Sequence, residues 1–583
     1  MNVIGFKEAK CKNCYKCVRV CEVKAIMVQN EQAQIMNDKC ILCGHCLDAC
    51  PQNAKTFISD LDRVKGYLRA GIPTIVSIAP AYLGVMKYNT PGQVISALLK
   101  LGFKEVRETA EGAAYITNEY EKLISAGEMD NIITTCCPSV NDLIEIYYPS
   151  LTKYMAPVVS PMIAHGKLIR AMYGNDVKVV FLGPCIAKKR EAESDERTKG
   201  YIDAVINFKE LEVWLKEEGI DLFSLPDTPP QNPSPEVNRL YPISSGVLSS
   251  VIATKPENTE QSDKYRKFYV HGLQNCVDLF ESMKRGEING SFIEANICNG
   301  GCIKGPAIDR DVISRFKVKL DMEETIPKKP VKKETFFHGN MGVSFAKAFG
   351  DRSPKDPLPS EDEIAEILRK TGKTKPEDML NCSACGYPSC RDKAIAVYQG
   401  KAELTMCVPY MYERAHSMSN VVLDTTPNII IIVDADMKIQ EFSAAAEHYF
   451  HISRAKAREM YLYEIIDHTD FIEVLDSHES ILGKRVVYED IGLATLQNIV
   501  YMKEQNCVLG IFQDVSSEEE QKKQAYKVKM ETIEMAQKVI DKQMMVAQEI
   551  AGLLGETTAE TKVTLTKLRD TILYDGGEPP VSR

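Results

Sequence analysis

The cysteines of this chain are gathered into short groups, and this grouping constrains its folding more than any other feature of the sequence. Of the 19 cysteines in 583 residues, eight lie between Cys11 and Cys50 and four lie between Cys382 and Cys407. Such grouping in a long chain indicates metal ligation, because disulfide frameworks belong to small secreted domains. We therefore expect metal centres at both groups.

The first group contains two copies of the pattern C-x2-C-x2-C-x3-C, and the second copy is followed by proline. In this pattern a tight loop places three thiolates around one 4Fe-4S cluster, while the fourth cysteine serves the other cluster. The expected ligands of one cluster are Cys11, Cys14, Cys17 and Cys50. The expected ligands of the second cluster are Cys40, Cys43, Cys46 and Cys21. A pair of zinc sites is the alternative, because four thiolates also suit zinc.

Residues 1–60, which hold this group, resemble a bacterial two-cluster ferredoxin, and the resemblance implies one-electron transport. Glu22 follows Cys21 where that family usually has proline. The segment is therefore expected to form a two-cluster, ferredoxin-like domain.

Length and charge limit the remaining possibilities. A chain of 583 residues is too long for one hydrophobic core, so three or more packed units are expected. The net charge of −10 gives no reason to bind nucleic acid or anionic lipid. No apolar run approaches the roughly 20 residues that cross a bilayer, and the first residues lead into cysteines rather than into a signal-peptide core. We expect a cytoplasmic protein with no nucleic-acid or membrane partner.

Residues 70–310 alternate apolar, strand-like runs with helical patterns, as an α/β domain does. Three of these runs are predicted to be buried strands: residues 75–78, 132–135 and 177–182. Three cysteine-bearing motifs follow predicted strands or lie in loops: residues 134–139, 183–191 and 294–302. Loops at the carboxyl ends of strands converge in open α/β sheets, so four cysteines from these loops could hold one 4Fe-4S cluster.

These three motifs match, in order, the active-site motifs of the FeFe hydrogenases, and the resemblance covers roughly residues 70–310. It implies that one 4Fe-4S cluster is ligated by Cys137, Cys185, Cys298 and Cys302. It also implies that Cys302 bridges to a di-iron subsite with carbonyl, cyanide and dithiolate ligands, which maturation proteins supply. A relative that carries the cubane alone, like the eukaryotic iron-sulfur assembly factors, is the alternative.

The same resemblance gives roles to other side chains. Cys136 would pass protons to the bridgehead amine of the dithiolate, and Lys188 would hydrogen-bond a cyanide ligand. Glu191 would orient the Lys188 loop, and Glu119 is a further candidate for the proton relay. Lys122 stands where a relay carboxylate is expected.

Four departures from the family pattern bear on the cavity. Gly183 and Asn296 stand where methionines usually pack, and no tryptophan follows the Cys137-Pro138 pair. In addition, Lys304-Gly-Pro replaces a glycine-rich run. We expect a more polar or roomier pocket and slow turnover.

The second cysteine group can enclose one more 4Fe-4S cluster, with the ligands Cys382, Cys385, Cys390 and Cys407. Residues 376–415 resemble the small cluster domain of corrinoid iron-sulfur proteins and electron-transport complexes. Zinc is again the alternative, because spacing does not select the metal. The stretch before it, residues 316–375, is predicted to be a linker, rich in lysine and proline at residues 326–333, with a helical extension.

Residues 420–516 change character and resemble a PAS domain. Strands are predicted at residues 429–433 and 507–512, a helix at 444–450, and a hairpin turn at Asp434. Residues 517–575 are predicted to be signalling or dimerisation helices, beginning with a capping box between Ser517 and Glu520. Near-heptad spacing predicts a dimer seam, with a helix packed on its own domain as the alternative. The seam residues are Val528, Met535, Val539, Val546 and Leu553.

The expected fold is therefore multidomain, α+β and α/β, with residues 61–315 forming the hydrogenase-like domain. This domain order resembles that of sensory FeFe hydrogenases. The resemblance implies slow, reversible oxidation of H2 to two protons and two electrons, with the redox signal passing through the clusters to the PAS-helix output. The implied partners are H2, protons, a ferredoxin or other redox protein, a signalling phosphatase or kinase, and a second copy of the chain. A ferredoxin-linked metabolic hydrogenase and a non-catalytic redox scaffold without di-iron are the alternatives.

Overall fold

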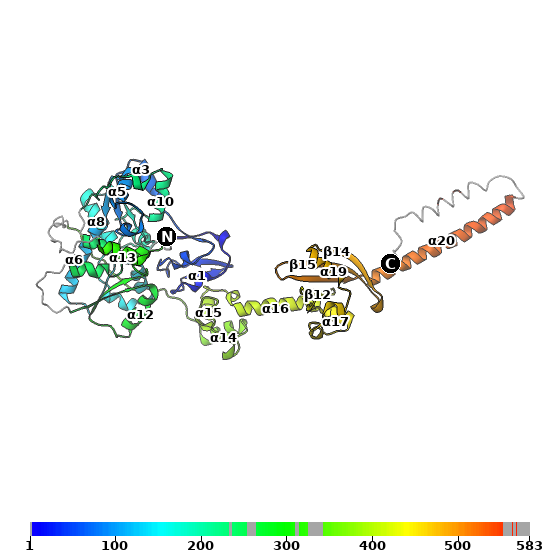
Figure 1. Ribbon diagram of the computed structural model, residues 1–583. Helices are drawn as coiled ribbons and strands as arrows, with labels where there is room; N and C mark the ends of the chain where they lie inside the picture. Colours follow the sequence, from blue (N-terminus) through cyan, green and yellow to red (C-terminus); the bar gives the residue numbers. More distant parts are fainter. Residues whose placement is uncertain are drawn as a thin grey trace. The chain divides into compact units, whose positions relative to one another are not determined.

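The computed structural model of the protein describes residues 3–232, 236–253, 264–308, 314–324 and 342–551, together with residues 563 and 567. Two compact units make up the chain, residues 1–411 and residues 412–583 (Figure 1). The predicted cluster ligands all lie in the first unit. The linker predicted at residues 326–333 lies outside the described residues.

Two parallel sheets form the centre of the first unit. The larger sheet consists, in spatial order, of β6 (Glu105–Glu108), β5 (Thr74–Ile78), β8 (Lys178–Leu182) and β9 (Ala204–Ile206). The smaller sheet consists of β10 (Arg266–His271), β11 (Ser291–Asn296) and β7 (Asn131–Ile133). The strands predicted at 75–78 and 177–182 are confirmed, and the strand predicted at 132–135 is shorter because β7 ends at Ile133. Every residue of β5 is buried, as in a parallel sheet covered on both faces.

Helices pack on these sheets around two buried apolar cores, one at each sheet (Figure 1). In chain order they are α3 (Leu61–Arg69), α4 (Tyr82–Val85), α5 (Gly92–Lys100), α6 (Ala110–Ala126), α7 (Pro138–Tyr147), α8 (Pro161–Tyr173), α9 (Ala187–Glu193), α10 (Phe208–Glu217), α11 (Gly246–Ala253), α12 (Leu273–Lys284) and α13 (Arg315–Glu324). Helices α6 and α8 lie in close contact, because a side chain at Gly112 would overlap the carbonyl oxygen of Pro161. This contact brings the first turn of α6 next to His165.

The N-terminal segment consists of two similar halves. Its strands form two antiparallel pairs, β1 (Ile4–Phe6) with β4 (Lys55–Phe57) and β2 (Ile26–Gln29) with β3 (Gln32–Ile35). The short helices α1 (Lys16–Arg19) and α2 (His45–Asp48) each follow a residue in the left-handed conformation, Tyr15 or Gly44. Each such residue turns the chain sharply within a cysteine loop, so that successive cysteines can face one centre.

The second cysteine group packs against this N-terminal segment. It is carried by α14 (Glu361–Lys370), α15 (Cys390–Tyr398) and the start of α16 (Val408–Thr425). Tyr387 and Met406 from this group share one buried apolar core with Cys17 and Val18. Two cysteine-rich segments that lie far apart in the sequence are therefore neighbours.

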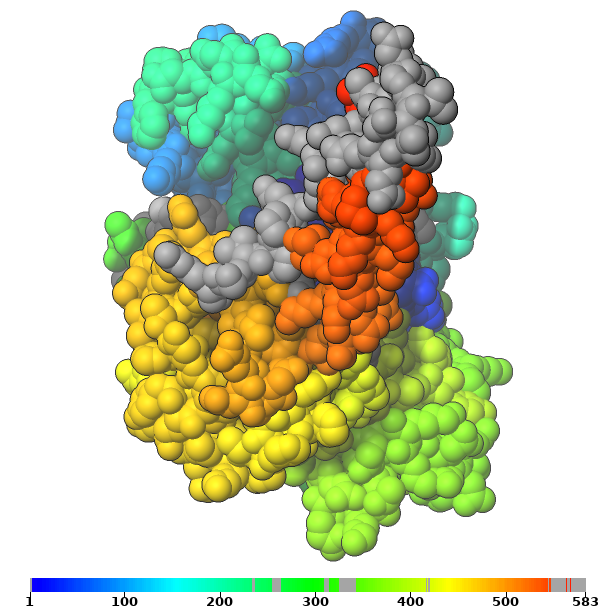
Figure 2. Space-filling model, turned by 90° about the vertical axis from the view of Figure 1, so that its right-hand side faces the viewer, coloured from blue at the N-terminus to red at the C-terminus, as the bar shows by residue number. Residues whose placement is uncertain are grey.

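The second unit contains one antiparallel sheet with the strand order β13-β12-β16-β15-β14. Its elements are β12 (Ile429–Val433), β13 (Ile439–Phe442), α17 (Ala444–Phe450), α18 (Arg454–Ala457), α19 (Thr469–Ser477), β14 (Ile481–Tyr488), β15 (Leu493–Met502) and β16 (Cys507–Asp514). In Figure 2 these residues, coloured yellow to light orange, form one compact body. The predicted strands, the helix at 444–450 and the turn are confirmed, since Asp434 Oδ1 accepts hydrogen bonds from the backbone N–H groups of Asp436 and Lys438.

The C-terminal helix α20 (Ser516–Ala551) leaves the last strand of this sheet. It begins one residue before Ser517, and Asp514 Oδ1 accepts a hydrogen bond from Ser516 N at 2.8 Å. The predicted cap at Ser517 is therefore wrong, because the carboxylate of Asp514 already binds an N–H group at the start of the helix. The described seam residues are exposed, from 41% at Val546 to 67% at Met535, and Leu553 lies outside the described residues.

Among the described residues, no helix combines the length and the apolar composition that crossing a membrane requires.

Candidate functional site

Five cysteines predicted to belong to the central site line one cavity: Cys136, Cys137, Cys185, Cys298 and Cys302. The loops that carry these cysteines follow the carboxyl ends of β7, β8 and β11, and Cys302 begins the single-turn helix η5 (Cys302–Lys304). Parallel strands in two sheets thus bring together residues that lie far apart in the sequence.

The donor set of the cavity fits an iron-sulfur group. Its walls are largely apolar, with Ala79, Phe181 and Pro306 among them. Burial raises the pKa of the Cys185 thiol to about 11, with the nearby Cys137 adding to the effect. Bound iron would supply the positive charge that holds such buried sulfurs as thiolates. In the part of the chain that the structure describes, no group of three or more histidine, cysteine, aspartate or glutamate side chains is arranged to bind a single metal ion.

Lys188 reaches the cavity from the first turn of α9. Its Nζ donates to the carbonyl oxygen of Cys136 at 3.1 Å and pairs with Glu191 Oε2 at 2.8 Å. Burial opposes the charge of Lys188, but the Glu191 carboxylate outweighs this and raises the pKa of the lysine. The same Oε2 accepts a hydrogen bond from Ser160 Oγ at 2.9 Å. Glu191 therefore holds a buried, charged ammonium at the cavity wall.

Cys136 precedes the predicted ligand Cys137 in the chain, and its sulfur contacts the hydroxyl of Tyr120. Tyr120 OH accepts a hydrogen bond from Thr135 N and lies 3.1 Å from Cys136 Sγ, a contact in which either group can donate. Burial raises the pKa of the Cys136 thiol to about 12. This arrangement positions a protonated thiol at the cavity wall.

Glu119 is not brought to the other predicted site residues. It forms an ion pair with Lys122 at 2.6 Å on the partly exposed face of α6 and is absent from the cavity lining. Adjacent helix positions point about 100° apart, and it is the next residue, Tyr120, that faces the interior. The prediction that Glu119 belongs with the site is therefore not supported by its position.

Glu294 is the acidic residue that sequence reasoning missed. It lies on β11 with only 1% of its surface exposed, and its carboxylate accepts hydrogen bonds from Ser245 N and Leu248 N, both at 3.0 Å. Burial raises its pKa to about 7. Its charge also contributes to the raised pKa of Cys136. A carboxylate between Ile293 and Ala295, within the buried strand Ser291–Asn296, was the available signal.

Two of the sequence departures have a structural explanation. The ring of Phe181 occupies the space beside Gly183, so this glycine does not by itself open the cavity. Asn296 lines the cavity and donates to Glu294 Oε1 at 3.1 Å, so a polar group does stand at that wall. The Phe181 ring therefore fills the space beside Gly183, Asn296 adds a polar side chain to the wall, and the expectation of a more polar or roomier pocket stays a prediction.

Comparison with known proteins identifies the domain around this cavity. Residues 72–306 match the family model for the iron only hydrogenase large subunit, C-terminal domain. Iron hydrogenase 1 of Clostridium pasteurianum is 29% identical over 361 residues, which cover 46% of this chain and 63% of that protein. The periplasmic Fe hydrogenase large subunit of Nitratidesulfovibrio vulgaris is 27% identical, over 37% of this chain and 62% of that protein.

The central domain of the chain, residues 72–306, therefore belongs to the FeFe hydrogenase family. The chain is a hydrogenase-like iron-sulfur protein that spans 63% and 62% of the length of these two curated relatives. Residues 10–54 match a 4Fe-4S dicluster domain and residues 378–409 match an Fe-S cluster model. A solved structure of a variant FeFe hydrogenase from Chlamydomonas reinhardtii is 20% identical, covers 51% of this chain and 100% of that chain, and has a TM-score of 0.43.

The N-terminal cysteine loops touch the hydrogenase domain. Cys43 lines the central cavity, and a side chain at Gly44 would overlap Pro306. The fourth cysteines of the two patterns have equivalent surroundings, because Cys21 Sγ and Cys50 Sγ each accept a backbone N–H bond at 3.3 Å from the residue four positions later. Such bonds are typical of cluster sulfurs and help to set their reduction potential.

A second cavity, of about 500 Å³, lies at the other cysteine group and is lined by Cys382, Cys385, Cys390 and Cys407. Lys373 Nζ lies 3.3 Å from Cys407 Sγ, so a cation accompanies these sulfurs. Arg19 connects this group to the N-terminal loops, since it donates to the carbonyl oxygen of Ala384 at 3.0 Å and to that of Cys14 at 2.9 Å.

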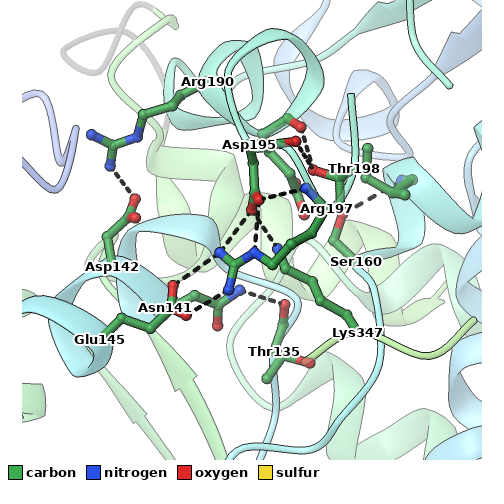
Figure 3. A network of polar contacts seen from close by, with 12 residues as sticks. Thr135, Asn141, Asp142, Glu145, Ser160, Arg190, Asp195, Arg197, Thr198 and Lys347 are labelled. Carbon is green, nitrogen blue, oxygen red and sulfur yellow. Dashed lines mark hydrogen bonds and ion pairs between the residues drawn. The ribbon is translucent and has the colours of Figure 1, made fainter. Parts of the chain in front are cut away.

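A polar network fixes the helices that carry the hydrogenase-domain loops (Figure 3). Arg197 binds Glu145 on α7 at 2.6 Å and Asp195, just after α9, at 2.7 Å. Arg190 on α9 pairs with Asp142 on α7. Lys347 reaches Asp195 from the segment beyond the hydrogenase domain at 2.9 Å. Because α7 follows Cys137 and α9 carries Lys188, this network holds two walls of the cavity in one geometry.

Proposed function

We propose that this protein is a sensory FeFe hydrogenase that oxidises H2, reversibly and slowly, to two protons and two electrons. One observation carries the proposal: the four motif cysteines, Cys136 and Lys188 all line the same buried cavity. Cys137, Cys185, Cys298 and Cys302 would hold a 4Fe-4S cluster there, with Cys302 shared with a di-iron subsite. That group, when bound, supplies the chemistry that splits and forms H2.

The residues of the cavity would position the group and handle the proton. Lys188 presents a charged ammonium to an anionic ligand, and Glu191 maintains that charge. Cys136 holds a proton on sulfur under the hydroxyl of Tyr120. We place Glu294 rather than Glu119 next in the proton path, because Glu294 is buried near Cys136 and has a pKa close to neutral.

Electrons would leave through the N-terminal clusters. Cys43 at the cavity wall makes the cluster of Cys40, Cys43, Cys46 and Cys21 the first acceptor. The cluster of Cys11, Cys14, Cys17 and Cys50 would follow. Arg19 joins the Cys14 loop to the loop before Cys385, so the third cluster is the next acceptor.

The third cluster would connect the electron path to the output. Helix α16 begins at Val408, directly after Cys407, and its chain continues into the second unit. A one-electron change at this cluster alters the charge at the positive end of the helix. We propose that a PAS domain at residues 420–516, α20 and a second copy of the chain convey this change to a signalling phosphatase or kinase.

A metabolic hydrogenase that exchanges electrons with ferredoxin is the second candidate. The ferredoxin-like segment is compatible with it, because the clusters of residues 10–54 would also serve bulk electron transport. The two candidates differ in what H2 does: in the sensor it changes the affinity for a partner, and in the metabolic enzyme it only drives turnover.

The primary test reconstitutes the full chain with iron, sulfide and the di-iron complex. Infrared spectra record carbonyl and cyanide bands while hydrogen-dependent dye reduction is assayed. We expect the bands together with slow turnover. A sample whose hydrogenase domain binds zinc, or that shows no bands after complete maturation, would contradict the proposal and favour the scaffold without di-iron.

A further inference from the structure

Four side chains form a hydrogen-bonded series from the cavity wall into the protein interior. Thr109, at the start of α6, lines the cavity, and its Oγ1 lies 2.7 Å from Ser77 Oγ on β5. Ser77 Oγ in turn lies 2.7 Å from His165 Nδ1 on α8. His165 Nε2 lies 3.1 Å from Glu111 Oε2 on α6. These contacts connect a titratable imidazole to the cavity through two hydroxyl groups.

The series is enclosed within the hydrogenase domain. Ser77 and His165 are fully buried, and Glu111 and Thr109 are 2% and 5% exposed. Mutual hydrogen bonding explains why such polar groups tolerate burial. Hydroxyl and imidazole groups can both donate and accept, however, so the same contacts allow two opposite directions of donation.

The protonation state of His165 decides this direction. When Nε2–H donates to Glu111, the neutral Nδ1 accepts from Ser77, and Ser77 accepts from Thr109. Thr109 then presents only lone pairs to the cavity. When His165 is an imidazolium, Nδ1–H donates to Ser77, Ser77 donates to Thr109, and the Thr109 hydroxyl proton turns to the cavity.

Charges on the neighbouring elements set the resting state. Glu111 on α6 and Glu108 on β6 favour the imidazolium, whereas Arg107 on β6 opposes it. Burial has the largest effect and lowers the pKa of His165. Although burial opposes its charge, Glu111 keeps a pKa of about 2, because His165, Arg107 and the amide of Asn232 stabilise its carboxylate. His165 is therefore neutral at neutral pH, and the series rests in the accepting state.

We propose that Thr109, Ser77, His165 and Glu111 store one proton for the reaction in the cavity. On uptake, a group in the cavity gives a proton to Thr109 Oγ1, the Thr109 hydroxyl proton passes to Ser77 Oγ, and the Ser77 hydroxyl proton passes to His165 Nδ1. One bond to hydrogen forms for each that breaks, no electron moves, and the product is an imidazolium beside Glu111. The reverse steps return the proton. This inference rests on the proposed function, because it requires a protonatable group in the cavity.

The test compares infrared band positions of the full chain, carrying its clusters and the di-iron group, between about pH 5 and about pH 8. In the unmodified protein we expect the cyanide and carbonyl bands to shift as the pH falls, because Thr109 changes from acceptor to donor. Thr109→Val removes the hydroxyl with little change of shape and reduces the shift to the part that other groups such as Glu294 cause, whereas Thr109→Ser keeps the full shift. Ser77→Ala reduces the shift in the same way. Ser250→Ala, which removes another fully buried hydroxyl of the same domain, keeps it.

The possible outcomes separate this inference from the function on which it rests. Bands that do not move with pH in the unmodified protein, or that move equally in Thr109→Val, overturn the proton store and leave the cofactor assignment intact. An unmodified protein without carbonyl or cyanide bands contradicts the proposed function and the proton store together.

Discussion

Single residues control the proton chemistry proposed for the cavity, and their roles follow from burial and from their nearest partners. Lys188 stays charged because Glu191 is 2.8 Å away. Glu294 has a pKa near 7 because little water reaches it. Cys136 lies within hydrogen-bond distance of Tyr120, in keeping with the proton-passing role that we propose for it. We therefore propose different roles for Lys188, Glu294 and Cys136.

The first prediction concerns the proton donor. Cys136→Ala should abolish most hydrogen-dependent dye reduction while leaving the carbonyl and cyanide infrared bands in place, because the change removes a thiol that passes protons and leaves the cluster ligands intact. Activity that persists in this variant would refute the role assigned to Cys136.

The second prediction distinguishes two acidic residues. Glu294→Gln should lower turnover by about 100-fold, since it removes a carboxyl group that can exchange a proton near neutral pH. Glu119→Gln, the matched control, should change turnover by less than about twofold, because its partner Lys122 is solvent-exposed. Steady-state assays of both variants at pH 7 provide the measurement, and the opposite ranking would restore Glu119 as the relay.

At the scale of elements, the electron path depends on how closely short loops approach one another. Gly44 combines a φ of 81° with direct packing on Pro306, so the loop of the nearest N-terminal cluster sits against the loop of Cys302. An alanine there meets both backbone strain and a steric overlap. Gly71 provides a comparison, because it has a φ of 66° with no atom near its missing side chain.

The third prediction uses this pair of glycines. Gly44→Ala should destabilise the protein by about 2–4 kcal/mol and slow the reduction of the N-terminal clusters by H2, because the loop must move away from Pro306. Gly71→Ala should lower the free energy of unfolding by about 1 kcal/mol, because only the left-handed backbone conformation opposes the new side chain. Thermal unfolding and electron paramagnetic resonance under H2 measure the two effects. Equal losses in both variants would show that the contact with Pro306 is unimportant.

At the scale of the molecule, the proposed signal must pass from the first unit to α20, a helix whose described seam residues are exposed. Val528, Met535, Val539 and Val546 lie exposed along α20 at near-heptad spacing. A single chain leaves this apolar surface in water, so a second copy of the helix is the partner we infer.

The fourth prediction tests this dimer. The double substitution Met535→Glu and Val539→Glu should convert the protein from dimer to monomer in analytical ultracentrifugation, because it places charges in the seam. Lys538→Glu adds a negative charge on the same turn outside the seam and should leave the dimer intact. A protein that is monomeric before substitution, or a dimer that survives the double substitution, would exclude α20 as the contact.

Interactions between residues that are close in the sequence were sufficient to predict many elements of this protein. The spacing of the cysteines predicted three cluster segments, and periodicity predicted the strands at residues 75–78 and 177–182 and the helix at 444–450. The turn at Asp434 was predictable because its carboxylate binds backbone groups only two and four residues away. Local chemistry decides each of these features.

Only the tertiary structure decided which distant groups meet. Ser77, Thr109 and His165 belong to a strand, a helix start and a second helix, so their contact depends on how α6 and α8 pack on the sheet. The inward position of Glu294 and the outward position of Glu119 depend on the same packing. The Cys382 group joins the N-terminal loops through a shared apolar core. Long-range packing determines these contacts. The spacing of residues in a single sequence does not predict which distant residues pack together.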